Sequence, residues 1–163
     1  MDVGRGRGEF LSLLAESGIS ANGVDIDESM LARARAKGVS VVLDDAVEYM
    51  DSLEKESLGA VVSFQVIEHL PVELLRHLLT SAMRVLRPGG VLIAETVNPH
   101  SPAALKTFWL DLTHVRPLYP ESMLLLAKEC GYDRGEIFFP RRTGVLDREL
   151  RLSGEYSLIA YRA

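Results

Sequence analysis

The strongest constraint on the fold is that short apolar runs alternate with longer segments of helical period along most of the chain. Such alternation is typical of a parallel sheet, because each strand must return to the same edge through a helical crossover. It predicts an α/β, Rossmann-like, doubly wound and mostly parallel sheet with helices on both faces. The expected strands are residues 22–26, 39–43, 59–64 and 91–97, and the expected helices are residues 9–17, 28–37 and 72–86.

The last third of the chain departs from this rhythm. Residues 98–119 are rich in proline, histidine and aromatic residues and show no clear period. A helix is expected over residues 121–130, and two strands near residues 136–139 and 156–161 are expected to form a C-terminal antiparallel hairpin. Of the earlier strands, we expect 39–43 and 59–64 to be buried on both faces.

Length and composition favour one domain spanning residues 1–163. With 163 residues, 47% of them hydrophobic, the chain has ample material for a single core. Only Met1, Asp2 and Val3 precede the first glycine, so we expect the first strand to be clipped. The one cysteine, Cys130, excludes an internal disulfide, and its apolar helical setting predicts a core thiol.

The charge of the chain bears on its partners. A formal net charge of -5 argues against a nucleic-acid surface, which needs clustered Lys and Arg, and favours a small-molecule partner. Arg134, Arg141 and Arg142 are basic, but we interpret them as a solvated rim on the late hairpin. No apolar run approaches the roughly 20 residues that span a bilayer, so we expect no membrane span and a cytoplasmic protein.

A glycine-rich turn stands directly before the first expected helix, in the run Asp2-Val3-Gly4-Arg5-Gly6-Arg7-Gly8. Open α/β sheets bind ligands at such turns, where glycine lets the backbone approach the ligand. An acidic residue about 20 positions later, at the end of the next strand, can accept hydrogen bonds from ribose hydroxyls, and Asp25 fills this position. The same spacing suits NAD, although the third glycine comes one residue sooner here, and Asp2 suits a cationic ligand better than a pyrophosphate.

This run is similar to the Asp-x-Gly-x-Gly-x-Gly signature of class I S-adenosylmethionine-dependent methyltransferases. Three further stretches resemble the same family in the right order: residues 23–27, 43–46 and 64–70, with the turn 86–90 after them. The resemblance implies S-adenosyl-L-methionine as the cofactor. It implies that the glycine turn binds the cofactor through Asp2, Gly4, Gly6 and Gly8. In the stretch 23–27 it implies ribose binding by Asp25 and an apolar wall for adenine from Ile26. In the later stretches it implies adenine binding by Asp45 and Ala46, and a position beside the methionine part for Gln65.

Three details of these stretches carry separate expectations. Asp44 is the register alternative to Asp45 for the adenine amino group. Asp27 is expected to cap the helix that begins at Glu28, because Asp is a favoured N-cap residue. Glu68 and His69 are expected to face the acceptor, with helix capping and packing as the alternative.

The acceptor chemistry is expected in the loose segment. We expect His114 to act as general base, with Asp111 or Arg116 orienting it or the acceptor, and His100 is the runner-up. The run Asp-x-Thr-His-x-Arg-Pro resembles that of bacterial methyltransferases associated with polysaccharide or glycolipid assembly, which implies a saccharide or glycolipid precursor as acceptor.

Three alternatives stay open. Asp111, His114 and Glu95 could hold a divalent metal, but without regular ligand spacing we predict no metal site. A clipped Rossmann-like domain could instead serve as a non-catalytic scaffold for a partner chain. The third alternative is a nicotinamide-dependent oxidoreductase.

Overall fold

The computed structural model describes residues 1–163 except residues 5, 7, 141–147, 149 and 151. Arg141 and Arg142, two of the three residues of the expected basic rim, therefore lie outside the described residues. The elements in chain order are β1 (Asp2–Val3), α1 (Glu9–Glu16), β2 (Asn22–Asp25), α2 (Glu28–Ala36), β3 (Ser40–Leu43), α3 (Ala46–Ser52), β4 (Leu58–Phe64), the 3-10 helix η1 (Ile67–His69), α4 (Val72–Val85), β5 (Leu86–Val97), α5 (Pro102–Phe108), α6 (Pro120–Glu129), β6 (Arg134–Phe138) and β7 (Glu155–Tyr161).

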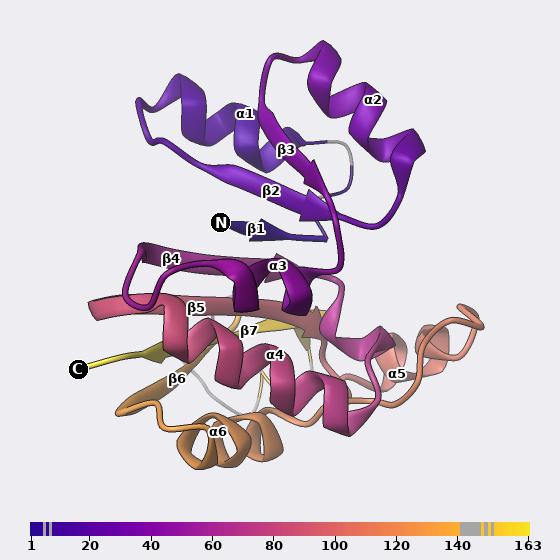
Figure 1. Ribbon diagram of the computed structural model, residues 1–163. Coiled ribbons are helices and arrows are strands. Elements are labelled where there is room, and N and C mark those ends of the chain that lie inside the picture. Colours follow the sequence, from indigo (N-terminus) through magenta and orange to yellow (C-terminus); the bar gives the residue numbers. More distant parts are fainter. Residues whose placement is uncertain (5, 7, 141–147, 149, 151) are drawn as a thin grey trace.

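The strands form a seven-stranded sheet with the order β3-β2-β1-β4-β5-β7-β6 (Figure 1). The first five strands are parallel, whereas β7 pairs antiparallel with both β5 and β6. The two-residue β1 lies between β2 and β4, with Val3 opposite Val24 and Ser63. The predicted Rossmann-like fold is confirmed, together with the antiparallel pair at its C-terminal end.

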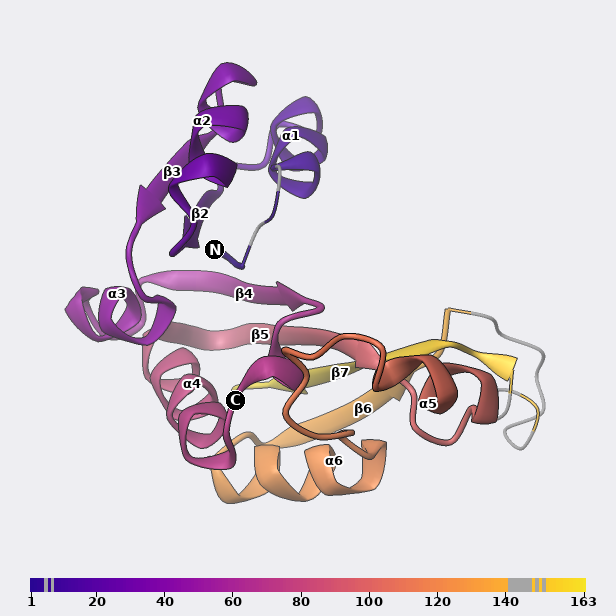
Figure 2. The ribbon, with the colours of Figure 1, turned by 90° about the vertical axis from the view of Figure 1, so that its right-hand side faces the viewer.

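Helices cover both faces of this sheet. The views in Figures 1 and 2 place α3, α4 and α6 on one side and α1 on the other. The core lies mainly between β4, β5, β7 and α4, because alternate residues of β5 such as Leu92 and Ala94 point inward beside Leu79 and Leu158. Among the described residues, no helix is long and apolar enough to cross a membrane.

The structure corrects several expectations. The strand expected at residues 39–43 is not buried on both faces, because β3 is the edge strand and its residues are half-buried or exposed. Helices α3 and α5 were not expected at all. Strand β5 begins at Leu86 instead of Val91, since the turn residues before Val91 continue the strand. Cys130 is only half-buried, at the end of α6, so it borders the core.

We predict that Leu158→Ala lowers the free energy of unfolding by about 2–5 kcal/mol, because it leaves a cavity in the centre of the core. Leu158 is fully buried and stands opposite Ala94 and Ile137 in the sheet. The matched control is Leu125→Ala on α6, where the side chain is 59% exposed and the expected change is within about 0.5 kcal/mol. Urea denaturation measures the free energy of unfolding of both variants. Equal losses would show that Leu158 in β7 contributes no more to the core than the exposed Leu125 does.

Candidate functional site

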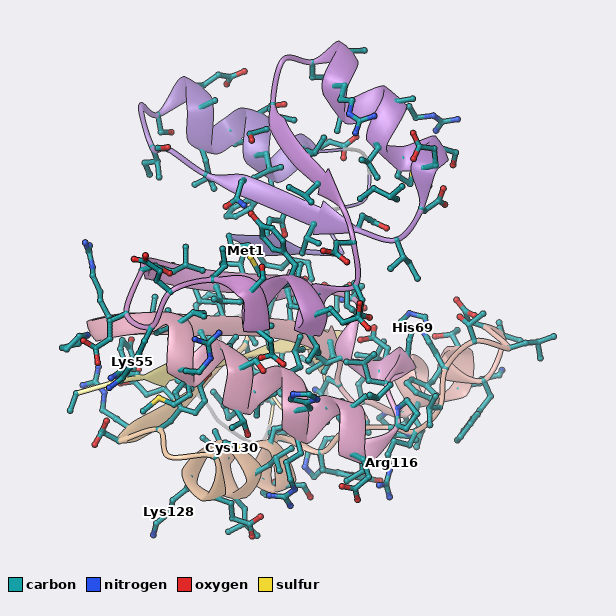
Figure 3. The ribbon with its side chains drawn as sticks, viewed as in Figure 1. Met1, Lys55, His69, Arg116, Lys128 and Cys130 are labelled. Atoms are coloured by element: carbon teal, nitrogen blue, oxygen red, sulfur yellow. The ribbon has the colours of Figure 1, made fainter. Side chains whose placement is uncertain are left out.

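The site lies at the carboxyl ends of the parallel strands. The chain leaves β1 toward α1 on one side and η1 follows β4 on the other, so the strand order reverses between these neighbours. Open α/β sheets bind ligands in the crevice at such a point. Figure 3 shows His69 at this edge of the sheet.

Two glycines of the first turn are needed where they stand. Gly4 has φ 63°, and a Cβ there would lie 2.3 Å from Cγ2 of Val66, which is far inside van der Waals contact. Gly8, with φ 76°, is the N-cap of α1, and a Cβ there would lie 3.0 Å from Cβ of Ala34 in α2. Only glycine combines these left-handed conformations with such close neighbours. The turn therefore brings bare backbone to the ligand crevice.

Two hollows meet at Gly4. The first hollow has a mostly apolar lining with three carboxylates at its rim. It is lined by Val3, Gly4, Val24, Asp25, Ile26, Asp44, Asp45, Ala46, Val47, Val66, Leu70, Leu74 and Leu78. The second hollow is lined by Asp2, Gly4, Gly6, Glu9, Phe10 and Phe64. The cofactor residues named from sequence, apart from Gly8 and Gln65, thus line one continuous region around the glycine turn.

Asp25 ends β2 with its carboxylate held in place. Its Oδ1 accepts a hydrogen bond of 3.0 Å from the backbone N of Asp27, which orients the carboxylate at the rim of the apolar hollow. Asp27 is confirmed as the N-cap of α2, because its Oδ1 accepts from the backbone N of Ser29 at 2.8 Å. The apolar side chain of Ile26 is 77% exposed, so it can contact an apolar ligand.

Asp45 has a structural role that was not expected. It is the N-cap of α3, and its Oδ1 accepts from the backbone N of Val47 at 2.8 Å and of Glu48 at 3.1 Å. The signal was present in the sequence, because Asp at the cap with Glu three residues later is a helix-start pattern. Asp44, the register alternative, accepts from the backbone N of Asp45 at 2.9 Å. Both carboxylates line the hollow.

Gln65 is one of two described non-glycine residues in the left-handed region, with φ 54°. Its backbone N donates to the backbone O of Glu95 at 3.0 Å, and its side chain hydrogen-bonds the carboxylate of Glu95. Burial, with repulsion from Glu155 as the second cause, raises the pKa of Glu95 above its usual value. Gln65 therefore joins the end of β4 to β5, and its side chain contacts Glu95 in this conformation.

Beyond the glycine turn, His114 and His69 lie together. Their rings are 4.7 Å apart between centroids, and the His114 side chain is only 11% exposed. The backbone N of Val115 donates to the backbone O of Glu68 at 2.9 Å, which ties the loop after α5 to η1. Both histidines were expected to face the acceptor, and the fold brings their rings into contact.

Thr113 connects this pair to Asp111. Its hydroxyl donates to Asp111 Oδ1 at 2.6 Å, and His69 Nδ1 lies 2.9 Å from the same hydroxyl oxygen. These hydrogen bonds from the Thr113 side chain and backbone hold the pKa of Asp111 below its usual value. Asp111 Oδ2 is 3.9 Å from His114 Nε2, so the expected pairing of Asp111 with His114 is present as a long contact.

The other acceptor candidates lie elsewhere. His100 Nε2 is 2.9 Å from a carboxylate oxygen of Glu121, and its ring packs against Tyr119. Arg116 lines a groove between α4 and α6 together with Arg76 and other residues of the two helices. The structure therefore gathers Asp111, Thr113, His69 and His114, while His100 pairs with α6.

Comparisons with known proteins agree on one family. Residues 1–94 match the family of methyltransferase domains. Over 133 residues the chain is 30% identical to "Probable S-adenosylmethionine-dependent methyltransferase" of Mycolicibacterium smegmatis, covering 82% of this chain and 51% of the relative. Over 125 residues it is 29% identical to the ubiquinone biosynthesis O-methyltransferase of Xanthomonas oryzae pv. oryzae, covering 74% of this chain and 51% of the relative.

The chain thus spans about half the length of these curated relatives. Among solved structures, a SAM-dependent methyltransferase from Archaeoglobus fulgidus matches with a TM-score of 0.89 and 29% sequence identity, covering 99% of this chain and 84% of that chain. The match extends beyond residue 94, so the loop after α5 and the antiparallel strands belong to the shared fold.

We predict that Gly4→Ala destabilises the protein more than Gly6→Ala does. Both glycines have positive φ, which costs about 1–2 kcal/mol for alanine. At Gly6 an added Cβ meets no atom of the described residues within 4 Å, whereas at Gly4 it must displace Val66, which adds about 1–3 kcal/mol. Urea denaturation of the two variants measures the difference, and equal losses would contradict the close approach of Val66.

Proposed function

The chain belongs to the class I S-adenosylmethionine-dependent methyltransferases, and from this premise we propose that it transfers a methyl group from S-adenosyl-L-methionine to a hydroxyl oxygen of a small molecule. The observation that carries the proposal is the arrangement at one edge of the sheet. The glycine turn, Asp25 and Asp45 surround an apolar hollow, and His114 lies beyond it with His69 beside it.

The described residues fit the cofactor that the family uses. An apolar hollow with Ile26 at its rim suits an adenine ring, and the oriented carboxylate of Asp25 suits the two ribose hydroxyls. We assign Asp45 and the backbone of Ala46 to the adenine edge; the cap formed by Asp45 Oδ1 leaves Oδ2 for the amino group. Asp2, Gly4, Gly6 and Gly8 are assigned to the methionine side. The bare backbone at Gly4 permits the close approach that this placement needs.

Gln65 is assigned to the same side of the cofactor. It stands at the end of β4, next to Val66, which lines the apolar hollow. Its contact with Glu95 holds the loop after β4 against β5, so we infer a positioning role for it.

The chemistry asks little of the protein beyond placement and proton transfer. The cofactor supplies a methyl group on a sulfonium, which is already electrophilic. The chain has to align the acceptor oxygen with that methyl group and to assist the loss of the hydroxyl proton. His114 is the residue we assign to this task, because its Nδ1 faces the backbone O of Phe108 at 2.7 Å. A neutral ring with its proton on Nδ1 presents a lone pair on Nε2 toward the acceptor side.

Asp111 and Thr113 support this assignment. They hold His69 beside His114 and place a carboxylate 3.9 Å from His114 Nε2, where a developing positive charge on the ring is favoured. His100, the alternative base, is engaged with Glu121.

A hydroxyl acceptor is favoured by two observations. The Xanthomonas relative is an O-methyltransferase by name, and the imidazole pair is suited to deprotonating a hydroxyl. The run Asp111-Leu112-Thr113-His114-Val115-Arg116-Pro117 resembles that of methyltransferases of polysaccharide and glycolipid assembly, so we propose a saccharide or glycolipid precursor as the first acceptor class to test. The identity of the acceptor does not affect the assignment of the cofactor, so the two are tested in separate experiments.

We predict that Asp25→Ala weakens binding of S-adenosylhomocysteine by about 10- to 100-fold, because hydrogen bonds from a charged group contribute about 1.5–3 kcal/mol. Isothermal titration calorimetry measures the affinity. Asp133→Ala is the matched control; Asp133 lies just before β6 and accepts from the backbone N of Ala163, away from the site. Unchanged affinity in Asp25→Ala, or binding of NAD in place of S-adenosylhomocysteine, would contradict the cofactor assignment.

We predict that His114→Ala leaves S-adenosylhomocysteine affinity unchanged while methyl transfer falls by about 100-fold or more, since the residue assists proton loss and not cofactor binding. Release of S-adenosylhomocysteine in the presence of monosaccharides, glycolipid headgroups and phenols measures the transfer. The control is His77→Ala, because His77 lies on α4 and pairs with Asp51. Full turnover by His114→Ala would remove His114 from the mechanism.

A further inference from the structure

Three potential metal ligands converge on the acceptor side of the site. One carboxylate oxygen of Glu68, one ring nitrogen of His69 and one of His114 all lie within 4.8 Å of one another. Glu68 and His69 come from η1, whereas His114 comes from the loop after α5, so the two segments meet at this point. The hydrogen bond from the backbone N of Val115 to the backbone O of Glu68 holds them together.

Both imidazoles are oriented by hydrogen bonds at Nδ1. His114 Nδ1 can only donate to its partner, the carbonyl oxygen of Phe108 at 2.7 Å. The hydroxyl of Thr113 donates its proton to Asp111 and so accepts from His69 Nδ1 at 2.9 Å. Each ring thus carries its proton on Nδ1 and keeps a lone pair on Nε2. A histidine that binds a metal through Nε2 has this arrangement, with its second nitrogen donating to a carbonyl or another oxygen.

Glu68 provides a second, independent observation. Its side chain is fully buried, and neither carboxylate oxygen has a hydrogen-bond partner in the part of the chain that the structure describes. A buried carboxylate is costly unless it is paired or coordinates a metal. A cation bound here would meet a buried carboxylate whose oxygens have no hydrogen-bond partner among the described residues.

We propose that Glu68, His69 and His114 bind a first-row divalent transition-metal ion, with the remaining coordination positions open toward the acceptor. Two imidazoles and one carboxylate suit such an ion, and three protein ligands with an open position are typical of catalytic sites. These ligands differ from Asp111, His114 and Glu95, the metal ligands considered from the sequence alone. Asp111 is engaged with Thr113, and Glu95 is hydrogen-bonded to Gln65 and Ser157.

This inference deepens the proposed function and rests on it for its meaning. An acceptor hydroxyl bound to the ion has a lowered pKa, so its proton leaves more readily to solvent. With the ion bound, the Nε2 lone pair of His114 would coordinate it, so His114 would act as a metal ligand in place of the general base and the proton would leave to solvent. Binding of the ion itself requires neither cofactor nor acceptor, so it is measured separately.

The test is a titration of the whole chain with Co²⁺ alone, followed through the visible d–d absorption of the bound ion. We expect one Co²⁺ per chain in the wild type and at least a 10-fold loss of affinity in Glu68→Gln and His114→Ala, since each removes a ligand. His77→Ala is the matched control for adventitious binding by the exposed pair His77 and Asp51, and it should retain the wild-type affinity. Circular dichroism and S-adenosylhomocysteine binding report whether each variant remains folded.

The outcomes separate the two proposals. Absence of a d–d band in the folded wild type, or unchanged Co²⁺ affinity in folded Glu68→Gln, overturns the metal site, even if S-adenosylhomocysteine binds and methyl transfer proceeds. If Glu68→Gln does not fold, Glu68→Asp and His69→Asn provide the same comparison with a shortened or replaced ligand. Co²⁺ binding at these ligands in a chain that binds no S-adenosylhomocysteine supports the metal site and overturns the proposed function instead.

Discussion

The close approach of Val66 to Gly4 determines the shape of the binding edge. With only a hydrogen on Gly4, Cγ2 of Val66 can lie 2.3 Å from the position that a Cβ would take, and the loop after β4 lies against the glycine turn. Val66 also lines the apolar hollow and is the N-cap of η1, which carries Glu68 and His69. The glycine turn and η1 are therefore joined through one residue. A change at residue 4 would be transmitted to both.

Polar contacts, not burial of apolar surface, hold the loop after α5, residues 109–115, in place. Leu110 and Leu112 are 78% and 95% exposed, whereas His114 in the same loop is turned inward. The inward contacts are the hydrogen bonds from Val115 to Glu68 and between Thr113 and His69. Such a loop has few apolar contacts to stabilise it, and its geometry depends on a small number of hydrogen bonds.

These two constraints explain what the sequence could predict. The repeated pattern of strands and helices and the cap at Asp27 are local signals, and the structure confirms them. The prediction that β3 is buried on both faces was wrong. An apolar run does not reveal how many neighbouring strands a strand has, and β3 lies at the edge of the sheet. Helix α3 was missed because Asp45 was interpreted as a cofactor residue and not as a helix cap. The meeting of Glu68 with His114 depends on tertiary contacts between residues 46 positions apart, which no local pattern encodes.

The charges at this edge allow two cations to be neighbours. At an effective dielectric constant of 20, two unit charges 4 Å apart interact by about 4 kcal/mol, and a divalent ion doubles that repulsion toward a sulfonium. The carboxylates lie on different elements, with Asp2 and Asp25 around the glycine turn and Glu68 in η1. Asp2 and Glu68 are buried, so their attraction for a cation is weakly screened. The separation of acidic residues between β1, β2 and η1 would therefore make the cationic cofactor and the proposed metal ion compatible in one site.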